Sequence, residues 1–118
     1  MSLKAKAVII WIPASRGGRS RVPSPMAGYT APARFDSDPQ QKLGSWSLRI
    51  LTEKKLKGNK IIAAKVGFLA EDAPDNLLQP RAKFDLLEGK RVVAKGVVLP
   101  PSIHPPAKIT GFEEVLLG

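Results

Sequence analysis

The frequency of chain-breaking residues restricts the fold of this chain more than any other feature. Its 118 residues include 11 prolines and 10 glycines. Because these residues recur at short intervals, no helical periodicity extends over a convincing length. Short β-strands are the regular elements that remain. A chain of this length that is 43% hydrophobic predicts one domain, whose core needs neither disulfides nor a structural metal.

Six segments have the pattern of strands. Trp46, Leu48 and Ile50 alternate with polar residues, which is the period of two typical of a strand with one buried face. The last two segments flank Glu88-Gly89 and predict a β-hairpin with a tight turn. The predicted strands are 4–12, 29–35, a segment centred on 46–50, 61–69, 81–87 and 90–99.

Local features refine three of these predictions. Segment 4–12 first alternates lysine with alanine and then becomes wholly apolar, which predicts a strand half exposed and then buried on both faces. Pro32 lacks the N–H donor of a β-ladder, which predicts an edge position or a bulge for segment 29–35. Segment 54–60 is strongly charged around Gly58-Asn59 and predicts a turn.

Six strands without intervening helices cannot form a parallel sheet, so they must form an antiparallel barrel or sandwich. We predict an all-β fold, a six-stranded antiparallel closed barrel over residues 1–99. Residues 100–118 contain Pro100-Pro101 and Pro105-Pro106 and predict an irregular proline-rich extension that cannot continue a ladder. The sequence leaves open whether this extension docks on the barrel or contacts a partner.

The supply of reactive side chains argues against catalysis. The chain has no cysteine, which excludes disulfides, thiolate ligands and cysteine nucleophiles. Its one histidine, His104, has no second histidine to act with. Glu71, Asp72 and Asp75 lack the spacing of a cation-binding loop and are better explained as a solvated loop. We therefore expect a non-catalytic protein without metal or cofactor.

Membrane insertion is not expected. The longest apolar run, residues 7–12, is far shorter than the roughly 20 residues that span a bilayer. No apolar stretch of signal-peptide length follows Lys4 and Lys6. We expect a cytoplasmic protein.

The charge is unevenly distributed along the chain. The formal net charge is +9. Residues 1–35 contain six basic and no acidic residues, and residues 36–66 contain seven basic and three acidic ones. This asymmetry favours a polyanionic partner, RNA first, although a basic surface that only aids solubility would give the same composition.

A basic loop is the first candidate site. Arg16, Arg19 and Arg21 surround Gly17-Gly18 in a stretch that no regular element tolerates. The glycines would form a backbone nest for a phosphate, with the arginines forking around the same group. The alternative is a flexible turn with solvated arginines.

Two further groups extend this hypothesis. Lys54, Lys55, Lys57 and Lys60 either enlarge the basic patch or form a charged hairpin tip that suppresses edge aggregation, which is the interpretation we favour. Among the aromatic residues only Tyr29 is kept as a base-stacking candidate, because Trp11 and Trp46 lie in apolar strand patterns and are expected in the core.

Two blocks of sequence resemble the C-terminal β-barrel domain of bacterial elongation factor Tu. The first block is the apolar strand 8–12 followed by Gly17-Gly18-Arg19 and Gly28-Tyr29. The second is the hairpin Leu-Glu-Gly-Lys-Arg-Val-Val-Ala-Lys-Gly-Val-Val at 87–98. The resemblance covers about residues 4–99 and implies a free-standing barrel of translation-factor type, with transfer RNA as a candidate partner.

The chain also departs from that family. Ser20 stands where the family has a histidine that helps contact transfer RNA, and Thr30-Ala31-Pro32 replaces Arg-Pro-Gln. No Gly-x-x-x-x-Gly-Lys-Ser/Thr loop is present, so no GTP site is expected.

These observations give two functional hypotheses. The first is a binding module for structured RNA or a ribonucleoprotein. The second is a protein interaction module without a nucleic-acid role, whose partner would be a translation factor, a toxin or another acidic protein. The residues predicted to bind RNA or an anion are Arg16, Gly17, Gly18, Arg19 and Arg21, with Tyr29 and Arg34 added if their strand returns to the same rim.

Overall fold

The computed structural model describes residues 5–19, 21, 23, 28–58 and 60–100. In this part of the chain there are two 3-10 turns, η1 (Ala14–Arg16) and η2 (Asp75–Leu78). None of its helices is long and apolar enough to cross a membrane. The predicted extension falls, from residue 101 onward, outside the described residues. The strands are β1 (Ala5–Trp11), β2 (Tyr29–Phe35), β3 (Trp46–Lys57), β4 (Ile61–Phe68), β5 (Lys83–Glu88) and β6 (Arg91–Val98).

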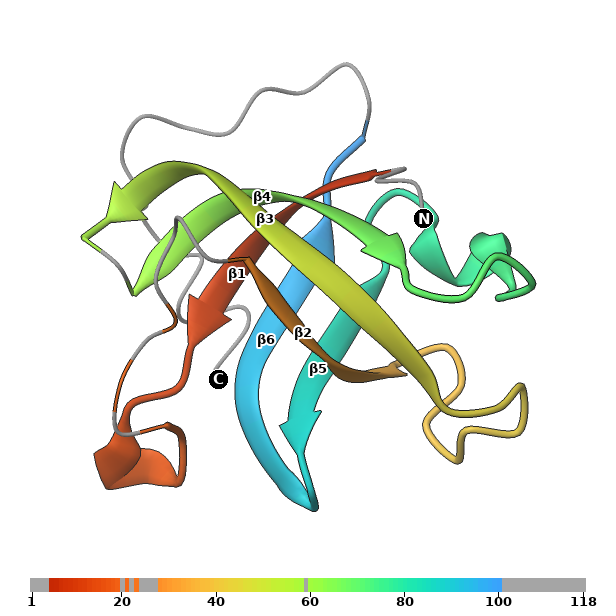
Figure 1. The fold of residues 1–118 in the computed structure, drawn as a ribbon, viewed down its shortest axis with the longest axis horizontal. Coiled ribbons are helices and arrows are strands. Elements are labelled where there is room, and N and C mark those ends of the chain that lie inside the picture. Colours follow the sequence, from red (N-terminus) through yellow and green to blue (C-terminus); the bar gives the residue numbers. More distant parts are fainter. Residues whose placement is uncertain (1–4, 20, 22, 24–27, 59, 101–118) are drawn as a thin grey trace.

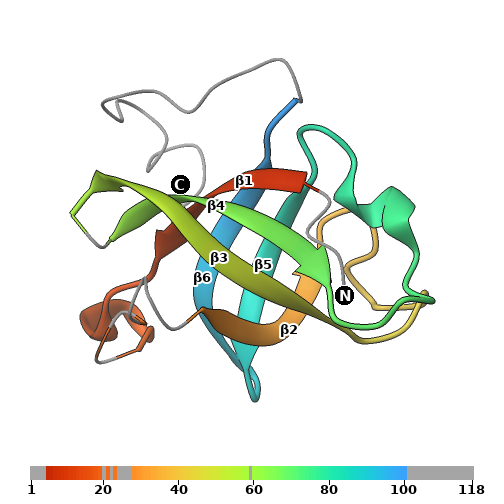
Figure 2. The ribbon, with the colours of Figure 1, turned by 45° about the horizontal axis from the view of Figure 1, so that its top comes forward.

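The six strands close into one antiparallel barrel in the order β1-β4-β3-β2-β5-β6 (Figures 1 and 2). Closure is visible at β1, where Ile9 pairs with Ile62 of β4 on one side and with Gly96 of β6 on the other. The predicted all-β, six-stranded antiparallel barrel is therefore confirmed.

The barrel interior is filled by the alternate apolar residues that the sequence pattern assigned to it. Leu48, Ile50, Phe84 and Leu86 are at most 2% exposed. The Phe35 ring packs against Phe84 at a centroid distance of 5.6 Å. Removing these side chains from water is the main force that stabilises the barrel.

A second apolar cluster lies on the outer side of β1. Val8 and Ile10 alternate with the interior residues of the strand and pack with Leu56, Ile61 and Leu99 instead. Val8 is 0% and Ile10 2% exposed, whereas Lys6 is exposed. The predicted change from half exposed to buried on both faces is confirmed within β1, whereas Lys4 lies outside the described residues and Ile12 follows the strand and is half-buried.

Pro32 lies at a position where only one side of β2 is paired. It is opposite Ser47 of β3, whereas the ladder between β2 and β5 begins at Ala33. The closed barrel thus accommodates the missing donor at a place where β5 does not require one.

Strand β3 is longer than the alternation predicts. It continues to Lys57, and its pairing with β4 shifts between Thr52 and Lys54 and again between Lys55 and Lys57. The register shifts are β-bulges or similar irregularities in the ladder. Segment 54–57, predicted as part of a turn from its charge and the following Gly58-Asn59, is therefore strand. The turn itself is limited to the region of Gly58, whose φ is 55°.

Gly96 is required by close packing inside the barrel. A Cβ atom at this position would lie 2.3 Å from Cζ of Phe84 and 2.9 Å from Cδ1 of Ile9. The missing side chain at Gly96 therefore lets Phe84 and Ile9 pack directly against the backbone of β6.

We expect Gly96→Ala to destabilise the barrel by about 1–3 kcal/mol, because the buried Phe84 ring has no space into which to move. Denaturant unfolding measures this change. Lys83→Ala, at an exposed position of β5, is the control and is expected to stay within about 0.5 kcal/mol of the wild type. Equal stability of Gly96→Ala and the wild type would contradict the packing argument.

Candidate functional site

The loop that follows β1 is held by its own backbone. Pro13 lies just after the strand, and η1 follows directly. The amide of Gly17 donates to the Ala14 carbonyl at 3.1 Å, and the amide of Gly18 donates to the Pro13 carbonyl at 3.0 Å. These two amides are used inside the loop and do not form the predicted phosphate nest.

The two positions of this loop require glycine for different structural reasons. Gly17 has a φ of 93°, which an L side chain rarely adopts. Gly18 lies against the preceding strand, and a Cβ atom there would be 1.7 Å from the Ile12 carbonyl oxygen. The Gly-Gly pair therefore shapes the loop that carries the arginines.

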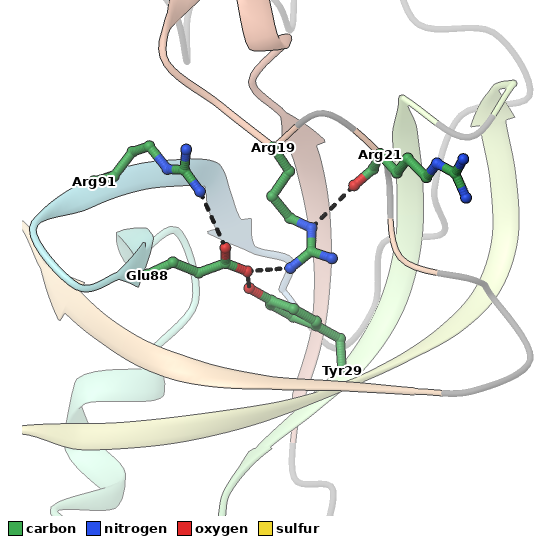
Figure 3. Close-up of polar contacts among 5 residues, drawn as sticks. All are labelled: Arg19, Arg21, Tyr29, Glu88 and Arg91. Carbon is green, nitrogen blue, oxygen red and sulfur yellow. Dashed lines mark hydrogen bonds and ion pairs between the residues drawn. The ribbon is translucent and has the colours of Figure 1, made fainter.

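Arg19 is held against the barrel by a cluster of polar contacts (Figure 3). Its Nη1 donates to a carboxylate oxygen of Glu88, and the hydroxyl of Tyr29 donates to the same oxygen. Nη2 of Arg91 approaches the other Glu88 oxygen at 3.4 Å. Nε of Arg19 donates to the Arg21 carbonyl at 2.9 Å. One carboxylate thus joins the loop after β1, the start of β2 and the β5–β6 turn.

Tyr29 is a component of this cluster and not a free stacking platform. The Arg19 guanidinium lies 5.4 Å from the centroid of its ring. Trp11, which is 5% exposed, meets the same ring edge to face at 5.2 Å. The core position predicted for Trp11 is confirmed, whereas Trp46 is partly buried and packs against the interior cluster.

The contacts of the cluster shift the pKa values of its members. The pKa of Tyr29 is raised to about 12, first by burial and then by its hydrogen bond and charge interaction with Glu88, against the opposing effect of Arg19. The hydrogen bond from Tyr29, together with the nearby Arg19, lowers the pKa of Glu88. The hydrogen bond to Glu88 raises the pKa of Arg19. At neutral pH the carboxylate and guanidinium are therefore charged and the phenol is neutral.

Arg34 does not join this cluster. It lies near the other end of β2, opposite Asp85 of β5. Its Nη2 contacts Oδ2 of Asp85 at 2.9 Å, and Lys95 contacts the second oxygen at 3.4 Å. Arg34 is therefore a partner in an ion-pair row on the barrel wall, away from the predicted rim.

Three connecting segments meet at the end of the barrel where β1 finishes. The amide of Trp11 donates to the Lys60 carbonyl and that of Ile12 to the Val93 carbonyl, both at 2.9 Å. Arg19 is tied to Glu88. Figures 1 and 2 show η1, the β3–β4 tip and the β5–β6 turn away from η2 and the 36–45 loop.

This end, which we term the basic end, is defined by the described residues of segments 12–28, 57–60 and 88–91. It contains one acidic residue, Glu88, and seven basic ones: Arg16, Arg19, Arg21, Lys57, Lys60, Lys90 and Arg91. The opposite end, formed by segments 36–45 and 69–82, contains two basic residues and five acidic ones. The asymmetry along the sequence has become an asymmetry between the two ends of the fold.

Two members of the basic end, Lys90 and Arg91, were predicted only as part of the hairpin. Lys57 and Lys60 were considered for the basic patch, but edge protection was the favoured interpretation. The strand topology could have indicated that these residues lie together. In a barrel whose neighbouring strands are all antiparallel, and whose chain alternates direction from strand to strand, the first, third and fifth connections lie at one end.

The described residues contain no cluster suited to a metal ion. Among them no three His, Cys, Asp or Glu side chains gather to hold a metal ion. A cleft of about 340 Å³ at the opposite end is lined by Ser37, Leu43, Leu77 and Arg81, among others, without an acidic side chain. His104 lies outside the described residues.

No protein-family model matches the chain, and no curated protein matches it. The resemblance to the elongation factor Tu barrel remains a prediction.

The single tyrosine of the chain reports on the Glu88 cluster. Because its pKa is raised above the ordinary 10.0 to about 12, stabilisation by the neutral phenol is complete below pH 10 and is lost as the pH rises through 12. We expect the phenolate absorbance of Glu88→Gln to titrate at lower pH than that of the wild type. It should remain above the ordinary value, because burial persists.

Asp85→Asn is the matched control for this titration. It removes one acidic charge from the barrel wall without touching Tyr29. Its phenol titration should coincide with that of the wild type. Equal shifts in the two variants would mean that net charge, and not the contact with Glu88, sets the pKa of Tyr29.

Proposed function

We propose that this protein is a non-catalytic binding module that holds structured RNA, or a ribonucleoprotein, at its basic end. The observation that carries the proposal is the segregation of charge between the two ends of the barrel. Phosphates neutralised by lysine and arginine release counterions, and this release supplies most of the affinity of such contacts.

The size of the molecule keeps the two ends electrostatically independent. Its principal extents are 34, 33 and 28 Å, whereas charges in physiological salt are screened beyond about 8 Å. The acidic end therefore does not cancel the field of the basic end. A polyanion approaching in solution is attracted to one end and repelled by the other.

The basic end is better suited to contacts with the phosphate backbone of RNA than to contacts with its bases. Arg16, Arg21, Lys60, Lys90 and Arg91 are exposed, and guanidinium and ammonium groups bind phosphate oxygens of any sequence. Every described phenylalanine and tryptophan packs in or against the core. A strand of unpaired bases would find no stacking surface among these residues. We therefore favour RNA recognised by shape and phosphate positions over a single strand.

The sequence resemblance supports the same proposal. A barrel of translation-factor type without a GTP-binding loop would act through its RNA contacts alone. Ser20 replaces the histidine that the family uses toward transfer RNA, so in this chain the arginines and lysines of the basic end would carry the contact. Transfer RNA is accordingly the first ligand to test.

The proposal is tested by removing three charges from the basic end. In the variant Arg16→Gln/Arg21→Gln/Lys60→Gln we expect weaker binding to transfer RNA. The slope of log affinity against log salt should fall by about one for each phosphate that is no longer neutralised. Titrations of purified protein across ionic strength, with an RNA duplex as second ligand, measure both quantities.

A matched control removes three charges from elsewhere. Lys42→Gln/Arg81→Gln/Lys83→Gln has the same net charge, but its substitutions lie in or next to the segments of the opposite end. We expect it to bind as the wild type does. Equal reductions in affinity in the two variants would mean that only total charge matters. Absence of RNA binding by the wild type, together with a protein partner retained after nuclease treatment, would replace this proposal with the protein interaction module.

A further inference from the structure

Glu88 is acidic, although a carboxylate at the basic end would repel the phosphates of RNA. It is the single acid of the basic end. Arg19, Arg91 and the Tyr29 hydroxyl are the charged and titratable groups that contact its carboxylate. Two cations thus compensate one anion, so the carboxylate leaves the basic end with an excess of positive charge. Its presence calls for a role other than binding the ligand.

The contacts of Arg19 indicate that role. Its guanidinium is bound by Glu88 through Nη1 and by the Arg21 carbonyl through Nε, and it lies over the Tyr29 ring. Two of the five N–H donors of Arg19 are thus used by protein acceptors, and one face of the guanidinium lies over the Tyr29 ring. These contacts connect the carboxylate at the end of β5 to the backbone of the loop.

The backbone at Arg21 is the point that this connection fixes. Figure 3 shows the Arg21 carbonyl turned toward Arg19 while its side chain extends away from the cluster. The Arg21 side chain is exposed. When the carbonyl of a residue is held in place, the backbone of that residue is restricted, and so is the direction in which its side chain leaves the backbone.

We propose that Glu88 and Arg19 form a positioning relay that sets the direction in which Arg21 meets a phosphate. The relay deepens the proposed function and rests on it. Glu88 orients the Arg19 guanidinium, and Arg19 holds the Arg21 carbonyl. Arg21 makes the ligand contact that the relay directs, and Glu88 and Arg19 act on it as positioning residues.

The relay is tested with a charge-neutral double variant. Arg19→Gln/Glu88→Gln removes one positive and one negative charge, so the net charge of the chain is unchanged. We expect weaker binding of transfer RNA and a salt slope lower by about one, the contribution of a single phosphate contact. Arg34→Gln/Asp85→Gln breaks a comparable ion pair on the barrel wall and should bind as the wild type does.

A conservative variant guards against a loss of folding. Arg19→Lys keeps the charge and the ion pair with Glu88, but a single ammonium group lacks the fork that reaches both the carboxylate and the Arg21 carbonyl. We expect it to reproduce the lower salt slope, with circular dichroism like that of the wild type. A wild-type slope in both Arg19→Lys and the double variant would overturn the relay.

Limited trypsin digestion separates failure of the relay from failure of the proposed function. Trypsin cleaves after Arg21, and cleavage requires local release of the backbone from its contacts. We expect faster cleavage at this bond in the double variant than in the wild type or in Arg34→Gln/Asp85→Gln. If the wild type binds no RNA, the proposed function fails, and the digestion still measures the relay. Equal cleavage rates in all three proteins would refute it.

Discussion

Closure of the antiparallel barrel is the constraint on which the rest of the structure depends. Because the chain alternates direction through all six strands, it sorts every connection to one of two ends. The first, third and fifth connections carry most of the basic residues outside the strands, and the second and fourth carry most of the acidic ones. The electrostatic polarity of the molecule thus follows from strand order and not from any local motif.

Strand positions could be predicted because they depend on local patterns. Segment 29–35 was predicted with the bounds that β2 has, since aromatic and alanine residues alternate with polar ones between turn-forming residues. Strand β3 exceeded its prediction because its last part depends on distant residues. Leu56 packs in the outer cluster with Val8 and Ile61, and a single sequence window does not contain that information.

The candidate site was predicted only in part, because some of its contacts join residues that are distant in the sequence. The arginines of the loop after β1 were identified from their local density. Glu88, the carboxylate that binds Arg19 and Tyr29, is 69 and 59 residues away from them. Arg34 was grouped with the site because the position of the rim along β2 was unknown, and its pairing with Asp85 places it on the wall.

The lysines of the β3–β4 hairpin need two explanations. Pairing of β3 with β2 stops at Ile50, so among the described residues the continuation of β3 pairs with β4 alone. Lys54 and Lys55 lie on this one-sided stretch, and charges there discourage association through a free edge. Lys60 lies beyond the strand and beside the loop after β1. Edge protection does not account for it, nor for the exposed residues of the other two basic segments. Their gathering at one end, against mutual repulsion, is what a shared anionic ligand would explain.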